Sequence, residues 1–347
     1  MTHHHHSGPA IVTRGLTRHF TSRKQTVEAV QGLDLEIGQG ELVAFLGPNG
    51  AGKSTTLRML TTLIPPTSGS ASVAGHDVVT AQRDVRLAIG FVGQGNGAGL
   101  RQLGRDELVS QGRAYGLSRA DAHRRADQLV EDLDLAEVAD RKVSSLSGGQ
   151  RRRLDIAMGL VHLPRVLFLD EPSTGLDPQN RVNLQELVRR LHAESGSTVV
   201  LTTHYLEEAD ALAQRVVVVD HGRVIADDTA ARLKSGLGDL LRLGFVTHEE
   251  AARAATRLER VPESRVDVDD DAVSLRVRDG STMVAELLAD LAADGAPPAR
   301  VEVSRPTLDD VFLDLTGRSL RETQHAPVTG DTTGSDNSFQ TESEVAA

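Results

Sequence analysis

The sequence Gly47-Pro-Asn-Gly-Ala-Gly-Lys-Ser-Thr55 decides the fold of this 347-residue chain. It follows the apolar run 42–46, which is typical of a buried strand, and it precedes a helical pattern over residues 56–63. A glycine-rich turn between a strand and a helix lets several backbone N–H groups converge on the phosphates of a nucleotide. The stretch therefore predicts a phosphate-binding loop in an α/β fold rather than a chance glycine turn.

Each residue of this loop has an expected task. Lys53 is expected to reach the β- and γ-phosphate oxygens, and the Ser54 hydroxyl to take one position on Mg²⁺. The glycines let the backbone approach the phosphates, and Thr55 adds a donor. The expected nucleotide-binding residues of the loop are Gly47, Pro48, Asn49, Gly50, Ala51, Gly52, Lys53, Ser54 and Thr55.

A second short apolar run, residues 165–169, ends in two adjacent carboxylates. Doubly wound α/β sheets bind their ligands at such strand ends. Because successive strand residues point to opposite faces, Asp170 can join the Mg²⁺ shell while Glu171 polarises the attacking water as general base. Acidic strand ends alone are common solvated caps, so it is the phosphate-binding loop that favours a hydrolytic site.

A serine and two glycines open another predicted helix at residues 146–150, which read Leu-Ser-Gly-Gly-Gln. Such a helix start is a second anion-ready N-terminus. The chain thus carries two phosphate-type sites but one Lys-Ser loop. This is hard to explain if each site binds its own nucleotide.

With these three motifs in this order, the chain resembles the ATP-binding cassette (ABC) ATPases over about residues 11–234. The resemblance implies a mixed-sheet P-loop core at 11–235, a helical subdomain at about 95–163, and ATP and Mg²⁺ as cofactors. It also implies a head-to-tail homodimer in which the second motif of one subunit closes over the ATP on the loop of the other. The residues of that motif are Ser147, Gly148, Gly149 and Gln150.

Other motifs of the family match this chain residue by residue. Gln94 follows the predicted strand 89–92, where the family contacts Mg²⁺ and the attacking water. Asp177 lies in the segment that crosses the family's dimer interface, and it is also a plausible N-cap of the next helix. His204 follows the predicted strand 198–202, where the family's switch histidine contacts the γ-phosphate, although a lone histidine there is more often a surface or cap residue.

The family places an aromatic ring under the adenine, and Phe20 occupies the matching position. The neighbouring His19 is an alternative stacking partner. A third possibility is that Phe20 is a core residue of an edge strand.

Composition agrees with a multi-domain enzyme that is 39% apolar and has no cysteine. The net charge of −11 and the lack of a basic stripe argue against nucleic acid as a partner. No apolar run approaches the roughly 20 residues that a membrane-spanning helix needs. Residues 1–10, with their histidine run, are interpreted as a tag or disordered leader.

A change of pattern at about residue 236 predicts a second domain, 236–320. Its order of strands and helices favours a small ferredoxin-like α+β fold. Residues 321–347 are polar and acidic, which predicts a disordered tail. The predicted strands are 240–246, 265–268, 272–277 and 300–303, and the predicted helices are 248–258 and 282–291.

Residues 306–318 resemble the C-terminal segment of the daunorubicin-resistance (DrrA-type) subfamily of drug-exporter ATPases. The residues themselves predict an amphipathic helix with Leu308, Val311, Phe312 and Leu315 on one face. Docking of this face onto the chain's own domain and recognition of a partner are equally expected from the pattern.

The leading hypothesis is an ATP-hydrolysing subunit of a bacterial exporter, peripheral on the cytoplasmic face of the membrane. It would work as a homodimer beneath two copies of a separately encoded permease. Two alternatives stay open, a soluble ABC machine for DNA repair or ribosome rescue and an importer subunit. The single motif set and the short insertion before residue 146 favour transport, and segment 306–318 favours export.

Overall fold

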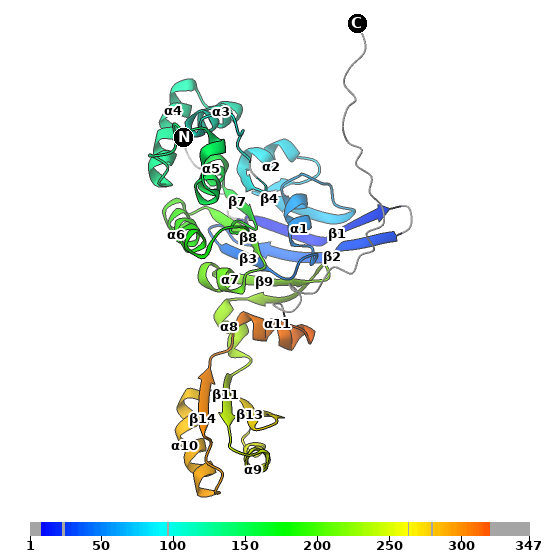
Figure 1. Ribbon diagram of the computed structural model, residues 1–347. Coiled ribbons are helices and arrows are strands. Elements are labelled where there is room, and N and C mark those ends of the chain that lie inside the picture. Colours follow the sequence, from blue (N-terminus) through cyan, green and yellow to red (C-terminus); the bar gives the residue numbers. More distant parts are fainter. Residues whose placement is uncertain (1–7, 23–24, 96, 263, 279, 320–347) are drawn as a thin grey trace, which may run out of the picture.

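The computed structural model has a larger part above a smaller one in the view of Figure 1. Residues 1–7 of the predicted leader and the predicted tail 321–347 lie outside the described residues. The structure describes residues 8–22, 25–95, 97–262, 264–278 and 280–319.

The larger part is built on a central six-stranded sheet. Its strands are β3 (Leu42–Leu46), β6 (Ile89–Val92), β7 (Val166–Asp170), β8 (Thr198–Thr203), β9 (Arg215–Asp220) and β10 (Arg223–Asp228). The order is β10-β9-β3-β8-β7-β6, with all neighbours parallel except the antiparallel edge strand β10. β3, β7 and β8 are buried along their whole length, as expected for parallel strands covered on both faces.

A four-stranded antiparallel sheet covers one face of the central sheet. Its order is β2-β1-β4-β5, with β1 (Ile11–Ser22), β2 (Gln25–Ile37), β4 (Ser68–Val73) and β5 (His76–Asp77). Alternate residues of β3 serve two separate cores because side chains alternate along a strand. Val43 and Phe45 pack with the antiparallel sheet, whereas Leu42, Ala44 and Leu46 pack on the opposite side.

Helices α1 (Lys53–Leu60), α2 (Gln82–Ala88), α6 (Pro178–Ser195) and α7 (Leu206–Leu212) flank these sheets. The helix after the phosphate-binding loop begins three residues earlier than predicted, at Lys53. It also ends earlier, since the Thr61 hydroxyl bonds to the Leu57 carbonyl oxygen at 2.8 Å and the next residue, Thr62, takes a positive φ of 63°.

The segment predicted as a helical subdomain is helical in the structure. It contains α3 (Gly104–Ala114), α4 (Arg119–Asp132), the 3₁₀ turn η1 (Val143–Ser145) and α5 (Gly148–Leu160). Ser118 caps α4 by accepting the Asp121 N–H at 3.1 Å. Leu129 and Val130 of this helix are buried.

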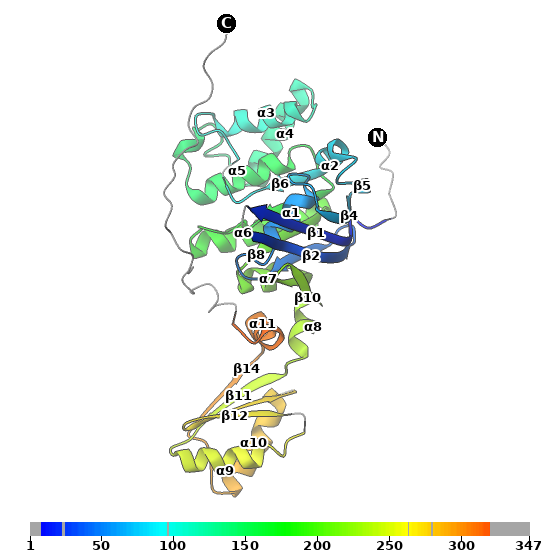
Figure 2. The same ribbon diagram turned by 90° about the vertical axis from the view of Figure 1, so that its right-hand side faces the viewer.

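The smaller part is an antiparallel sheet of order β12-β13-β11-β14 with two helices. Its elements follow as β11 (Asp239–Gly244), α9 (His248–Leu258), β12 (Arg265–Asp269), β13 (Ala272–Val277), α10 (Gly280–Ala293) and β14 (Arg300–Ser304). This is the predicted ferredoxin-like arrangement, and Figure 2 shows both helices on one side of the sheet. β11 ends two residues before the predicted end because the Val246 N–H already bonds to the Glu250 carboxylate of the α9 capping box.

The chain then returns to the larger part. Helices α8 (Ala230–Ser235) and α11 (Leu308–Thr316) lie beside each other between the two parts (Figure 2). Leu308, Val311 and Phe312 of α11 are buried in the core below the central sheet. The predicted amphipathic helix therefore docks onto its own chain. It packs on the larger part and not on the sheet of the predicted domain 236–320.

Candidate functional site

The site lies where parallel strands of the central sheet end. Because β3, β6, β7 and β8 are parallel neighbours, their carboxyl ends meet at one edge of the sheet. Gly47, Gln94, Glu171 and His204 each follow one of these ends, and Asp170 is the last residue of β7. The fold thus brings together motifs that are far apart in the sequence.

Lys53 begins α1 and lies beneath the loop, with only 4% of its surface exposed. Its Nζ donates to the carbonyl oxygens of Gly47 at 2.6 Å and of Pro48 at 2.9 Å. Burial lowers the pKa of Lys53, while the nearby carboxylates of Glu171 and Asp170 oppose this change. A buried cation held by carbonyl groups of the loop is well suited to receive phosphate oxygens.

At two positions of the loop only glycine fits, because neighbouring backbone atoms lie very close. A Cβ at Gly47 would lie 2.1 Å from the Val219 carbonyl oxygen of β9. Gly52 has a φ of 103°, and a Cβ there would lie 2.3 Å from the Ala29 carbonyl oxygen. The loop therefore rests directly on neighbouring backbone, and side chains at these positions would displace it.

Asp170 is the centre of a hydrogen-bonded set of oxygen ligands. Its Oδ1 accepts bonds from the Ser54 hydroxyl at 2.8 Å and the Thr202 hydroxyl at 2.6 Å. The Gln94 amide donates to the Ser54 Oγ at 3.2 Å. Among the described residues no group of three or more His, Cys, Asp or Glu side chains suits a metal. The set fits Mg²⁺, which typically takes one or two carboxylates and completes its shell with phosphate oxygens and water.

Glu171 adopts a strained backbone conformation with a φ of 46°. Its Oε2 lies 3.4 Å from His204 Nδ1 and accepts the Thr174 hydroxyl at 3.1 Å. The interaction with the His204 ring lowers the pKa of Glu171, although burial opposes this change. A carboxylate that stays ionised at the edge of the loop can accept a proton from water.

Lys53, Ser54, Gln94 and Glu171 face a cavity of about 170 Å³. The residues that line it are Ala29, Asn49, Gly50, Ala51, Gly52, Lys53, Ser54, Thr55, Gln94 and Glu171. Ala29 and Thr202 were not predicted as site residues, and Ala29 carries no local signal in the sequence. Thr202 is a polar residue at the end of an apolar strand beside Asp170, a pattern that does indicate a role.

Arg152 supports the site from behind. This residue of α5 is 8% exposed and donates to the carbonyl oxygens of Gly93 at 2.6 Å, Pro172 at 2.8 Å and Asp170 at 3.3 Å. Gly93 precedes Gln94 and Pro172 follows Glu171, so one guanidinium fixes the backbone on both sides of the site. Burial lowers the pKa of Arg152, while the charges of Asp155 and Asp170 oppose this change.

The residues of the second predicted phosphate site do not line this cavity. Ser147 and Gln150 form a capping box at the start of α5, in which the Ser147 N–H donates to Gln150 Oε1 at 2.9 Å and the Gln150 N–H donates to Ser147 Oγ at 3.3 Å. Asp177 caps α6 by accepting the Asn180 N–H at 2.8 Å, as predicted from its position. Gly148 is exposed at the start of α5 and Gly149 is buried there.

Phe20 also lies outside the lining of the cavity. The ring is 42% exposed on β1, and the Arg18 guanidinium stacks 4.7 Å from its centre. Phe20 is therefore not a buried core residue, and its expected contact with adenine stays a prediction.

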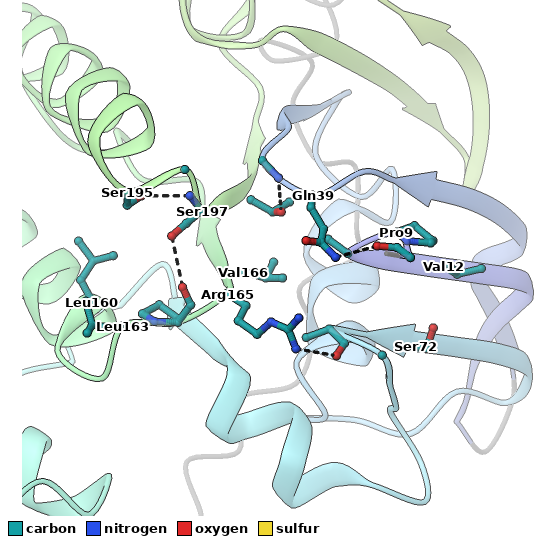
Figure 3. Close-up of a pocket in the computed structure, with 18 of the residues that line it drawn as sticks. Pro9, Val12, Gln39, Ser72, Leu160, Leu163, Arg165, Val166, Ser195 and Ser197 are labelled. Carbon is teal, nitrogen blue, oxygen red and sulfur yellow. Dashed lines mark hydrogen bonds between the residues drawn. The ribbon is translucent and has the colours of Figure 1, made fainter. Parts of the chain in front are cut away.

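A larger cavity of about 700 Å³ opens at the other ends of β7 and β8 (Figure 3). Its walls include Gln39, Arg165 and Ser197, and Arg165 donates to the Ala74 carbonyl oxygen at 3.4 Å. None of the residues predicted for nucleotide or metal binding lines it. The smaller cavity at the carboxyl ends is therefore the candidate site.

Comparison with known proteins agrees with this geometry. The family model described as ABC transporter matches residues 30–174. The chain is 42% identical to the daunorubicin/doxorubicin resistance ATP-binding protein DrrA of Streptomyces peucetius, over 91% of this chain and 96% of the relative. It is 35% identical to the linearmycin resistance ATP-binding protein LnrL of Bacillus subtilis (strain 168), over 86% of this chain and 96% of the relative.

A solved structure shares the fold of the larger part. It is the dimeric ATP-binding cassette MJ0796 in a post-hydrolysis state bound to ADP and Pi, with a TM-score of 0.58 and 25% identity, covering 63% of this chain and 98% of that one. Within the described ranges, no helix combines the length and apolar character needed to cross a membrane. The chain therefore belongs to the ABC transporter family, as an ATPase related to the daunorubicin-resistance ATP-binding proteins.

Proposed function

We propose that this ATPase powers the export of a drug, an antibiotic or another hydrophobic substrate. It works as a homodimer on two copies of a separately encoded permease, at the cytoplasmic face of the membrane. The observation that supports ATP hydrolysis is the hydrogen-bonded set of Ser54, Asp170 and Thr202, near buried Lys53 and the Glu171–His204 pair. It offers a cation for phosphates, oxygen ligands for Mg²⁺ and a base for water, which are the needs of phosphoanhydride hydrolysis.

The residues divide the chemistry among them. Lys53 and the backbone N–H groups of the loop hold the β- and γ-phosphates of ATP. Ser54, Asp170 and Gln94 hold Mg²⁺, which when bound neutralises charge on the phosphates. Glu171 accepts the proton of the attacking water, and His204 keeps its carboxylate ionised and oriented.

A second copy of the chain completes each site. Ser147 and Gly148 are exposed at the N-terminus of a 13-residue helix, outside the cavity of their own chain. Gly148 and Gly149 adjoin Leu176 and Asn180, so this helix start and the segment around Asp177 form one continuous surface. Such a surface fits the phosphates and the loop of a partner, and the related cassette MJ0796 is described as dimeric.

Export is supported by what the relatives are called. DrrA and LnrL are resistance ATP-binding proteins, and a further relative, from Ralstonia nicotianae, is a Nod factor export ATP-binding protein that is 36% identical over 91% of this chain. The matches cover 96% of DrrA and 96% of LnrL, and 91% and 86% of this chain. The match favours transport over a soluble ABC machine.

Mixing two inactive variants tests the composite site. Lys53→Ala removes the phosphate-binding cation, and Gly148→Arg blocks the helix start on the exposed surface. Each variant alone is expected to be inactive in Mg²⁺-dependent ATP hydrolysis. In a 1:1 mixture half of the dimers combine both chains and hold one intact site of two, so up to about a quarter of wild-type turnover returns. Full activity of the Gly148→Arg protein alone, or no recovery in the mixture, contradicts the arrangement.

Reconstitution tests the transport role. The chain and the membrane protein encoded by an adjacent gene, tested as the permease, are placed in phospholipid vesicles, and ATP turnover is compared with that of the chain alone. We expect association with the vesicles and permease-dependent stimulation that the Glu171→Gln variant lacks. Normal turnover without association with any membrane protein would contradict export.

A further inference from the structure

The C-terminal end of α11 contacts a turn behind the phosphate-binding loop. Gly317, with a φ of 73°, ends the helix and places Arg318 against the end of β9. Arg318 Nη2 donates to both carboxylate oxygens of Asp220, at 2.7 and 2.9 Å, and lies 2.9 Å from His221 Nε2. The Asp220 side chain is only 11% exposed. Leaving this carboxylate without its partner would therefore cost more free energy than at the surface.

Arg318 itself is held in place by the structure of α11. The apolar face of the helix is buried in the core below the central sheet. The Thr316 hydroxyl donates to the Phe312 carbonyl oxygen at 2.7 Å, and its oxygen lies 3.1 Å from the Arg318 carbonyl oxygen. Ser319 then bonds back to the Asp309 carboxylate at 3.0 Å. The position of Arg318 is therefore fixed by the docked helix.

The turn held by Arg318, residues 220–222, forms the back wall of the phosphate-binding loop. The Gly222 N–H donates to the Ala51 carbonyl oxygen at 2.9 Å. The Val219 carbonyl oxygen lies just before the turn, and a Cβ at Gly47 would clash with it. A Cβ at Gly52 would lie 3.3 Å from the Gly222 Cα. A shift of this turn would therefore shift the loop.

The conformation of the turn needs support. His221 has a φ of 46°, a left-handed conformation that is unfavourable for a residue with a side chain. Besides Arg318, the turn is held by Gln31, whose backbone N–H donates to the Gly222 carbonyl oxygen at 2.8 Å and whose amide donates to the His221 carbonyl oxygen at 3.0 Å. Arg318 is the contact that links this turn to the C-terminal segment.

The opposite face of α11 is tied to the smaller part. Asp310 pairs with Arg276 of β13, and Asp314 pairs with Arg265 of β12 at 3.0 Å. One helix thus connects the sheet of the smaller part (the accessory sheet), the core of the larger part (the ATPase core) and the turn 220–222 behind the phosphate-binding loop.

We propose that Arg318 is a positioning residue for ATP binding, and that the docked C-terminal helix α11 supports the phosphate-binding loop through it. The proposal rests on the placement of ATP on that loop under the proposed function. The pair with Asp220 holds the turn against Ala51, so the loop is arranged before the nucleotide arrives. Asp170 ends β7, and Glu171 and His204 follow β7 and β8, which lie on the other side of β3 from β9. We therefore expect the catalytic groups to be independent of this pair.

The test measures the Kd of a fluorescent ATP analogue, together with KM and kcat, on the full chain. Arg318→Ala is expected to raise Kd and KM by about two- to fivefold, the range of a partly exposed ion pair, with kcat within about twofold of wild type. Arg318→Lys restores most of the affinity. Arg265→Ala is the matched control, because it removes an ion pair on the other face of the same helix and should leave Kd unchanged.

A double-mutant cycle assigns the effect to the pair. Asp220→Asn alone should weaken binding about as much as Arg318→Ala, and the double variant should be no weaker than either. Unchanged Kd in Arg318→Ala, an equal loss in Arg265→Ala, or additive losses would overturn the proposal. Failure of the proposed function would show differently, because wild type would then bind no better than Lys53→Ala.

Discussion

Replacing Arg152 by alanine tests how the site is supported. The change removes a guanidinium that is 8% exposed and leaves the carbonyl oxygens of Gly93 and Pro172 without their partner. It also removes a buried positive charge near Asp155, which already has a raised pKa because of burial. Removing one partner of a buried charged network typically costs about 3–5 kcal/mol. At about 2–4 °C per kcal/mol, even the lower value lowers Tm by about 6–12 °C.

The same change should affect catalysis. Gly93 and Pro172 flank Gln94 and Glu171, so a loosened backbone misplaces both side chains. We expect kcat to fall by at least about tenfold, since small misplacements in an active site are costly.

The Tm of thermal unfolding and the kcat of steady-state ATP hydrolysis are measured for wild type and for Arg152→Ala. Arg153→Ala is the matched control, because Arg153 is the next residue on α5, and its guanidinium reaches the Leu133 and Asp134 carbonyl oxygens at 3.5 and 3.3 Å on the more exposed side. The control should change Tm by no more than a few degrees and leave kcat near wild type. An Arg152→Ala protein with the Tm and kcat of wild type would show that Arg152 does not support the site.

Three further predictions concern the strand ends. Gly47→Ala places a Cβ 2.1 Å from a carbonyl oxygen of β9, so kcat/KM should fall by about 100-fold in ATPase assays, and wild-type rates would contradict the close approach. Thr202→Val removes a 2.6 Å bond to buried Asp170 and should destabilise the protein by about 1–3 kcal/mol, measured by urea unfolding. His204→Ala removes the main cause of the lowered Glu171 pKa, so the acidic limb of the pH–rate profile should move to higher pH; an unmoved limb argues against the pair. A Glu171 pKa that is lower in the folded than in the unfolded state stabilises the fold at any pH above the unfolded-state pKa. This stabilisation is lost as the pH falls through the folded-state pKa. The His204→Ala variant should therefore also lose less stability between neutral and acidic pH.

The position of the site was predictable because its signals are local. A glycine-rich loop before Lys53 and two carboxylates after a buried strand specify strand ends, and parallel strands bring their ends to one edge. The same local logic identified the helix start at Ser147 and the cap at Asp177, both of which the structure contains. The contact of these residues with a partner's ATP depends on a second chain and stays a proposal.

The contacts that hold the site together were not predictable from the sequence. Arg152 bonds to carbonyl oxygens, which every residue carries, so no pattern of side chains indicates its partners. The pattern of α11 correctly predicts that Leu308, Val311 and Phe312 are buried, whereas Leu315 of the same predicted face is 45% exposed. The pattern does not predict the surface that covers the helix. Only the structure shows that this face lies in the ATPase core while Asp310 and Asp314 face the accessory sheet.

The most direct test of the central claim is the Glu171→Gln variant, which keeps the shape of the side chain and removes its basicity. Equilibrium binding of ATP, oligomeric state and Mg²⁺-dependent turnover are measured on the same preparation. We expect near wild-type ATP affinity, an ATP-dependent dimer that persists, and turnover reduced by at least about 100-fold. Turnover equal to wild type would remove Glu171 from its role and contradict the account.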